Sequence, residues 1–148
     1  MKEIDKREIL LILIVIILGI FIALNLFKND NNIDKNKEHY KKFIAYKKFG
    51  IAEDKKNIYA YMWIVSEAYY VEDNDLKKSI SDSMPYKFIF DRASEKLINY
   101  EIPEDGNQNN ISIKNMFPKI IQDEIINYDD DSNLQEEVDA YYKDILNE

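Results

Sequence analysis

The chain has 148 residues, of which 28 are acidic and 20 are basic, so its formal net charge at pH 7 is −8. It contains no cysteine and one histidine, which excludes a thiol nucleophile and argues against a zinc site, because zinc needs three or four suitable ligands. The negative charge disfavours nucleic-acid binding, since a domain of this sign repels phosphates.

An apolar segment near the N-terminus is the clearest feature of the sequence. Residues 9–27 carry no charge, and only Gly19 and Asn25 interrupt the apolar run. As a helix, the segment would be about 28 Å long, close to the ~30 Å hydrocarbon core of a bilayer. Large side chains stand at its end, where signal-peptide cleavage needs small ones. The sequence therefore predicts an eight-residue tail followed by an uncleaved, single-pass membrane anchor.

Two opposing arguments bear on the orientation of this anchor. Basic groups after the segment slightly outnumber those before it, which favours a cytoplasmic C-terminal domain. However, long domains are translocated largely regardless of charge, and a tail of eight residues is too short to fold. We expect an extracytoplasmic C-terminal domain, with the cytoplasmic orientation as the alternative.

Residues 28–38 are polar and predict a short tether, which leaves one domain, residues 39–148. The spacing of Tyr40, Phe43 and Ile44 predicts an amphipathic helix over residues 39–49. Residues 28–56 carry a net charge of +4, whereas residues 57–148 carry −12. The positive charge follows the anchor directly, so it predicts that nearby lysines lie close to the lipid headgroups. These candidate lipid-proximal residues are Lys41, Lys42, Lys47 and Lys48.

Three strands are predicted in the middle of the chain. Residues 57–71 are rich in Ile, Val, Tyr and Trp, with a bulge expected at Ser66 and Glu67 and a turn at residues 72–75. Residues 85–90 and 97–102 form the next two strands, and the turn that contains Gly106 ends the sheet. The order indicates a three-stranded antiparallel meander.

Aromatic residues on these strands are the one positive sign of a binding surface. Tyrosine and tryptophan combine a large contact area with a polar group, which suits the recognition of a peptide, a polysaccharide or a partner protein. The alternative is that they form the core with their polar groups at its rim. The candidate surface consists of Tyr59, Tyr61, Trp63, Tyr69 and Tyr70.

The C-terminal third is predicted to be helical. Residues 112–117 form a short turn, and Pro118 suits the first position of a helix that ends near Asn127. Ser132 and Gln135 have the spacing of a capping box ahead of a last helix, in which Leu134 and Val138 share one face. The domain is therefore expected to be α+β, with the meander flanked by helices.

The sequence offers little catalytic machinery. His39 lies among lysines near the tether, and three scattered glycines cannot form a phosphate-binding loop. The acidic run at residues 129–133 starts like a calcium loop but has Leu134 where the glycine of such a loop belongs. We therefore expect no catalytic residue, no metal site and no cofactor. A pair of carboxylates acting as a hydrolase on an envelope polymer remains the alternative.

Three short motifs resemble a known group of proteins. They are Ser-Met-Pro-Tyr-Lys-Phe at residues 83–88, Tyr-Glu-Ile-Pro-Glu-Asp-Gly at 100–106 and Ile-Lys-Asn-Met-Phe-Pro at 113–118. They are similar to motifs of uncharacterised single-anchor extracytoplasmic proteins of Gram-positive bacteria, and to the tail of some antirepressor-type membrane metallopeptidases. The resemblance implies a sensing or binding domain. The chain lacks the H-E-x-x-H motif of those peptidases, so it implies no peptidase activity.

Taken together, these features predict a non-catalytic, membrane-anchored binding or sensing module of the bacterial cell envelope. Its partners would be the membrane and an envelope protein or polymer. The cytoplasmic orientation would instead make the chain a regulator of a membrane partner. The sequence leaves the oligomeric state open.

Overall fold

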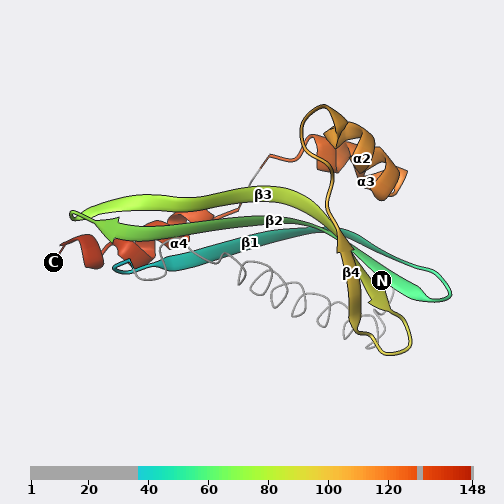
Figure 1. Cartoon of the computed structure of the whole chain (residues 1–148), viewed down its shortest axis with the longest axis horizontal. Coiled ribbons are helices and arrows are strands. Elements are labelled where there is room, and N and C mark those ends of the chain that lie inside the picture. Colours follow the sequence, from blue (N-terminus) through green and yellow to red (C-terminus); the bar gives the residue numbers. More distant parts are fainter. Residues whose placement is uncertain (1–36, 130–131, 148) are drawn as a thin grey trace, which may run out of the picture. The chain divides into compact units, whose positions relative to one another are not determined.

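The computed structural model describes residues 37–129 and 132–147, which form an α+β domain (Figure 1). Its strands are β1 (Lys41–Glu53), β2 (Asn57–Glu72), β3 (Asp75–Asp91) and β4 (Leu97–Glu101). They form one antiparallel sheet in the order β1-β2-β3-β4, so each strand pairs with its neighbour in the sequence. The α+β class and the antiparallel meander are confirmed, with four strands in place of three.

The helix predicted at residues 39–49 is wrong, because this segment lies within β1. Its residues pair with β2 in a regular antiparallel register, with Ala45 opposite Val65. β2 is buried along most of its length, so its backbone N–H and C=O groups need partners on both edges, and β1 supplies one set. Gly50 lies inside the strand at a register shift and does not end the element.

The hairpin of β2 and β3 turns where the sequence predicted it. Asp73 and Asn74 have φ angles of 52° and 63°, a left-handed conformation that Asp and Asn tolerate better than most residues. β3 begins ten residues before the predicted strand, because pairing with β2 continues from the turn. The bulge lies between Ala68 and Tyr69 rather than at Ser66 and Glu67.

Three helices follow the sheet: α2 (Asn109–Met116), α3 (Lys119–Ile126) and α4 (Leu134–Tyr142). Short 3-10 turns, η2 (Gly106–Gln108) and η3 (Ile145–Asn147), come before α2 and after α4. The helical C-terminal third is confirmed. The capping box is not, because Asn133 is the N-cap of α4 and no side chain caps the helix.

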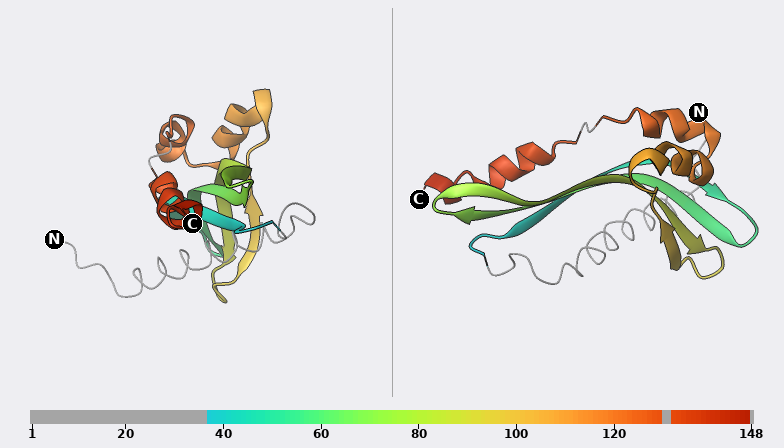
Figure 2. Two further views of the ribbon diagram at one scale, coloured as in Figure 1. Left: turned by 90° about the vertical axis from the view of Figure 1, so that its left-hand side faces the viewer. Right: turned by 45° about the horizontal axis from the view of Figure 1, so that its top comes forward.

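All three helices pack on one face of the sheet, which we call the helix face (Figure 2). The α4 cluster contains Phe43, Val65, Tyr69, Val71, Leu134, Val138 and Tyr142. The α2–α3 cluster contains Tyr61, Ile113, Phe117, Ile121 and Ile125. Side chains on the opposite face of β2 and β3 are buried as well, among them Ala60, Met62 and Phe88. The central strands therefore have apolar side chains on both faces.

The predicted tail and anchor, and the tether up to residue 36, lie outside the described residues. Among the helices that the structure describes, none is long and apolar enough to cross a bilayer.

Candidate functional site

Two of the five predicted binding residues are core side chains. Tyr61 is 6% exposed, and its ring centre lies 5.6 Å from that of Phe117. Tyr69 is 4% exposed and packs against Tyr142 of α4, with 6.4 Å between ring centres. Helices cover these residues, so they belong to the hydrophobic core.

The other three predicted binding residues are half-buried, and Tyr59 and Trp63 pack against the α2–α3 cluster. The hydroxyl of Tyr59 donates to Asp54, while the indole N–H of Trp63 donates to Ser83 at 2.8 Å. Tyr70 is on the opposite face, and its ring centre lies 3.7 Å from the ammonium group of Lys37. The five side chains therefore do not form the single exposed aromatic surface that we expected, because helices occupy most of that face.

The four candidate lipid-proximal lysines lie on the edge strand β1 and alternate between its faces. Lys41 and Lys47 are on the helix face, where their ammonium groups lie 3.5 Å from the ring centre of Tyr141 and 5.0 Å from that of Tyr128. Lys42 and Lys48 pair with residues of the opposite face. In a strand, these lysines point to opposite faces and do not form one basic surface. Lysines on an edge strand also discourage unwanted pairing with the strands of other chains.

Glu67 is the carboxylate of a small polar cluster beside the bulge. It accepts hydrogen bonds from Tyr69 at 2.5 Å, Lys78 at 2.7 Å and Ser81 at 3.2 Å. Burial by itself would raise the pKa of Glu67, but the hydrogen bonds from Lys78 and Tyr69 outweigh it and lower the pKa. A carboxylate held in its charged form by three donors stabilises the fold and is a poor general base.

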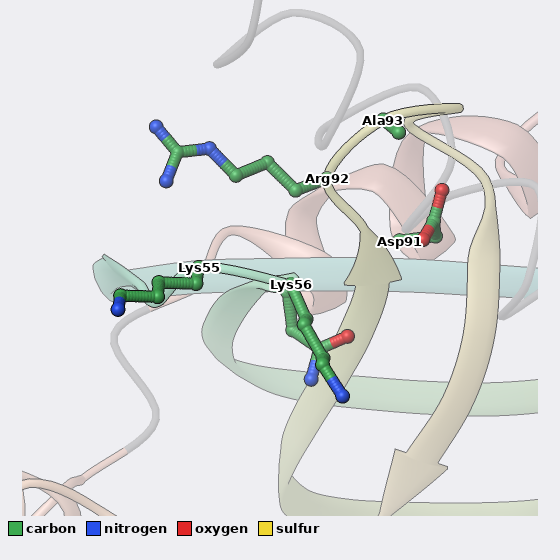
Figure 3. A pocket seen from close by; sticks show the side chains of 6 residues that line it. Lys55, Lys56, Asp91, Arg92 and Ala93 are labelled. Atoms are coloured by element: carbon green, nitrogen blue, oxygen red, sulfur yellow. The ribbon is translucent and has the colours of Figure 1, made fainter.

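A cavity of about 550 Å³, which we call the tip pocket, lies where two hairpin turns meet (Figure 3). It is lined by Lys55, Lys56, Asn57, Asp91, Arg92 and Ala93. Arg92 joins the two turns: its backbone N–H donates to the carbonyl oxygen of Lys56, and its Nη1 donates to that of Asp54, both at 2.8 Å. Its Nη2 also lies 3.5 Å from Glu53.

The carboxylates near this pocket shape its turns. Asp54 accepts the backbone N–H groups of Lys56 and Asn57 at 2.7 and 2.8 Å and the hydroxyl of Tyr59 at 2.8 Å. These hydrogen bonds, that of Lys56 first, lower the pKa of Asp54. At the other turn, Asp91 accepts the hydroxyl and the backbone N–H of Ser94, and these two bonds lower its pKa.

Sequence reasoning missed the tip pocket. Residues 91–96 stand between two predicted strands, and Lys55 and Lys56 belong to the stretch of net charge +4, so neither segment carried a sign of a site. The two segments are more than thirty residues apart, and only the pairing of β2 with β3 brings Asn57 opposite Asp91.

The described part of the chain holds no group of three or more His, Cys, Asp or Glu side chains arranged to bind a metal. His39, the one histidine, is exposed and lies 3.5 Å from its neighbour Glu38.

Comparison with known protein families, with curated proteins and with solved structures finds no match. The resemblance to single-anchor proteins and metallopeptidase tails therefore stays a prediction.

Proposed function

We propose that the chain is a membrane-anchored, non-catalytic binding or sensing module whose C-terminal domain lies on the extracytoplasmic side. The observation that carries the proposal is the uncharged apolar segment at residues 9–27, which has the length of a bilayer-spanning helix and is followed by an independent polar domain. The domain contributes a binding scaffold: four paired strands with helices packed on them.

The carboxylates near the tip pocket also favour binding over hydrolysis. A glycosidase-type mechanism needs two carboxyl groups facing each other across a cleft, about 5–9.5 Å apart. Asp91 is the one carboxylate among the residues that line the tip pocket, and its Oδ1 accepts the hydrogen bonds of Ser94. Its pKa is lowered, the opposite of what a general acid needs.

Membrane extraction combined with protease treatment tests this function. We expect the full chain to stay in the membrane fraction after an alkaline wash, and the domain to be cleaved by protease added to intact protoplasts. The double variant Ile14→Lys and Leu18→Lys should leave the membrane, because each lysine costs about 3 kcal/mol at the centre of a spanning helix.

The matched control adds the same charges outside the apolar segment, with Asn31→Lys and Asn36→Lys, and should remain in the membrane. A wild-type chain recovered as a soluble form that starts beyond Phe27 would refute the anchor. Protection of the domain in intact protoplasts would refute its extracytoplasmic location.

A further inference from the structure

We propose that the tip pocket binds the phosphate group of a phosphorylated sugar or polyol of the cell envelope. The inference rests on the proposed function, which places the domain where such compounds occur. It names the ligand class of a site that the sequence did not indicate.

Three cationic side chains border this cavity. Lys55 and Lys56 are exposed, and neither forms an ion pair with any residue that the structure describes. Figure 3 shows Lys55 and Arg92 extending to the same side of the two turns, whereas Lys56 extends in another direction.

The neighbouring acids are engaged elsewhere. Both carboxylate oxygens of Asp54 accept hydrogen bonds from its own turn, and Oδ1 of Asp91 accepts those of Ser94. These bonds, and for Asp54 also the charge of Lys56, lower the pKa of the two carboxyl groups. The hydrogen bonds come from backbone and hydroxyl groups, which leaves the lysine ammonium groups able to donate to a ligand.

The donors match the acceptors of a phosphate. A lysine ammonium group offers three hydrogen-bond donors and no acceptor. The guanidinium group of Arg92 already donates through Nη1 to the carbonyl oxygen of Asp54 and has Nη2 3.5 Å from Glu53, so only its remaining donors can serve a ligand. A phosphate group offers only acceptor oxygens at neutral pH and forms strong, charge-assisted bonds with such donors. Asn57 adds a side-chain amide to the wall of the cavity.

The shape of the site distinguishes a soluble ligand from a bilayer surface. The volume of about 550 Å³ falls within the range of small-molecule pockets, roughly 300–1,000 Å³. A single phosphorylated group can enter a hollow between two turns, whereas a planar array of headgroups would be met best by a flat basic surface.

The turns give the pocket a fixed frame. Arg92 hydrogen-bonds to two backbone carbonyl groups of the other turn, and both aspartates hold their own backbones. Such preorganisation lowers the entropy that a ligand loses by ordering the site.

The test is a titration of the full chain in zwitterionic lipid nanodiscs with glycerol phosphate, followed by backbone amide NMR. We expect chemical-shift changes centred on residues 54–57 and 91–94. Glycerol, the uncharged match, should cause none. The variant Lys55→Gln with Lys56→Gln should bind at least tenfold more weakly, while Lys119→Gln with Lys143→Gln, two exposed lysines on and after the helices, should bind as the wild type does.

Three outcomes overturn the proposal: equal binding by the Lys55→Gln and Lys56→Gln variant, shifts away from the two turns, or binding only when phosphatidylglycerol is added to the nanodisc. Loss of phosphate binding in a domain that protoplast proteolysis finds outside the cell would refute this site and leave the proposed function intact. Specific phosphate binding by a domain found in the cytoplasm would support the site and refute the proposed location.

Discussion

The hydroxyl group of Tyr142 connects three segments that are far apart in the sequence. It lies 2.7 Å from the carbonyl oxygen of His39 and 3.0 Å from that of Tyr69, and its side chain is 1% exposed. These contacts tie the end of α4 to the segment just before β1 and to the C-terminal part of β2. The hydroxyl has one proton and donates to one of the two carbonyl groups at a time, so its removal leaves that buried carbonyl group without this donor, at a cost in desolvation.

We therefore predict that Tyr142→Phe lowers the free energy of unfolding by about 1–2 kcal/mol, measured by urea denaturation of the purified chain. Tyr141→Phe is the matched control and should change it by less than about 0.5 kcal/mol, because Tyr141 is 39% exposed and phenylalanine keeps its ring contacts. Equal losses in the two variants would contradict the role of this hydroxyl.

The pKa of Tyr142 predicts how the stability of the domain changes at alkaline pH. Burial, followed by the nearby Tyr141, raises the pKa of Tyr142 to about 12, whereas an unfolded tyrosine titrates near 10. The neutral form is thus favoured in the folded state, and its contribution to stability is complete below pH 10 and lost as the pH rises through 12. The fall in unfolding free energy over this range should be shallower in Tyr142→Phe than in the wild type.

At the scale of elements, α3 contrasts an exposed face with a buried one. Ile125 is 1% exposed and lies in the α2–α3 cluster, whereas Ile120 is 90% exposed. Ile125→Ala should lower the free energy of unfolding by about 3 kcal/mol, because it removes buried methyl groups and leaves a cavity. Ile120→Ala, on the same helix, should change it by less than about 0.5 kcal/mol in urea denaturation. A large effect at Ile120 would mean that this side chain is covered in solution.

The element that sequence reasoning placed wrongly, residues 39–49, shows where local patterns fail. Tyr40, Phe43 and Ile44 fit a helical spacing, but the same stretch also alternates as a strand that presents Phe43 and Ala45 to the helix face. The choice depends on the partner: the edge of β2 offers unpaired backbone groups to this segment. Five of the eleven residues are aromatic or β-branched, a composition that also suits a strand.

At the scale of the whole molecule, β2 is the centre of the fold. It pairs with a strand on each edge over almost its full length, and it contributes to the clusters of α4 and of α2–α3. β4, by contrast, has five residues, and among the described strands it pairs with β3 alone. Asn99 and Tyr100 on β4 are exposed.

We predict that native-state hydrogen exchange, followed by NMR, is slowest for the amides of β2 and at least tenfold faster for those of β4. The reason is that opening β2 breaks pairing on both edges and exposes both core clusters, whereas β4 can separate from β3 alone. Exchange of β4 at the rate of β2 would show that the sheet opens as a single unit.

The sequence by itself determined the antiparallel order of β2, β3 and β4, the turn at Asp73 and Asn74 and the helical end of the chain. These features follow from local chemistry: periodicity, turn residues with positive φ, and Pro118 at the start of a helix. Only the tertiary structure decided the strand at residues 41–53, the burial of Tyr61 and Tyr69, and the meeting of two turns at the tip pocket. Each depends on contacts between residues distant in the sequence, since an exposed tyrosine on a strand and one covered by a later helix have the same local pattern.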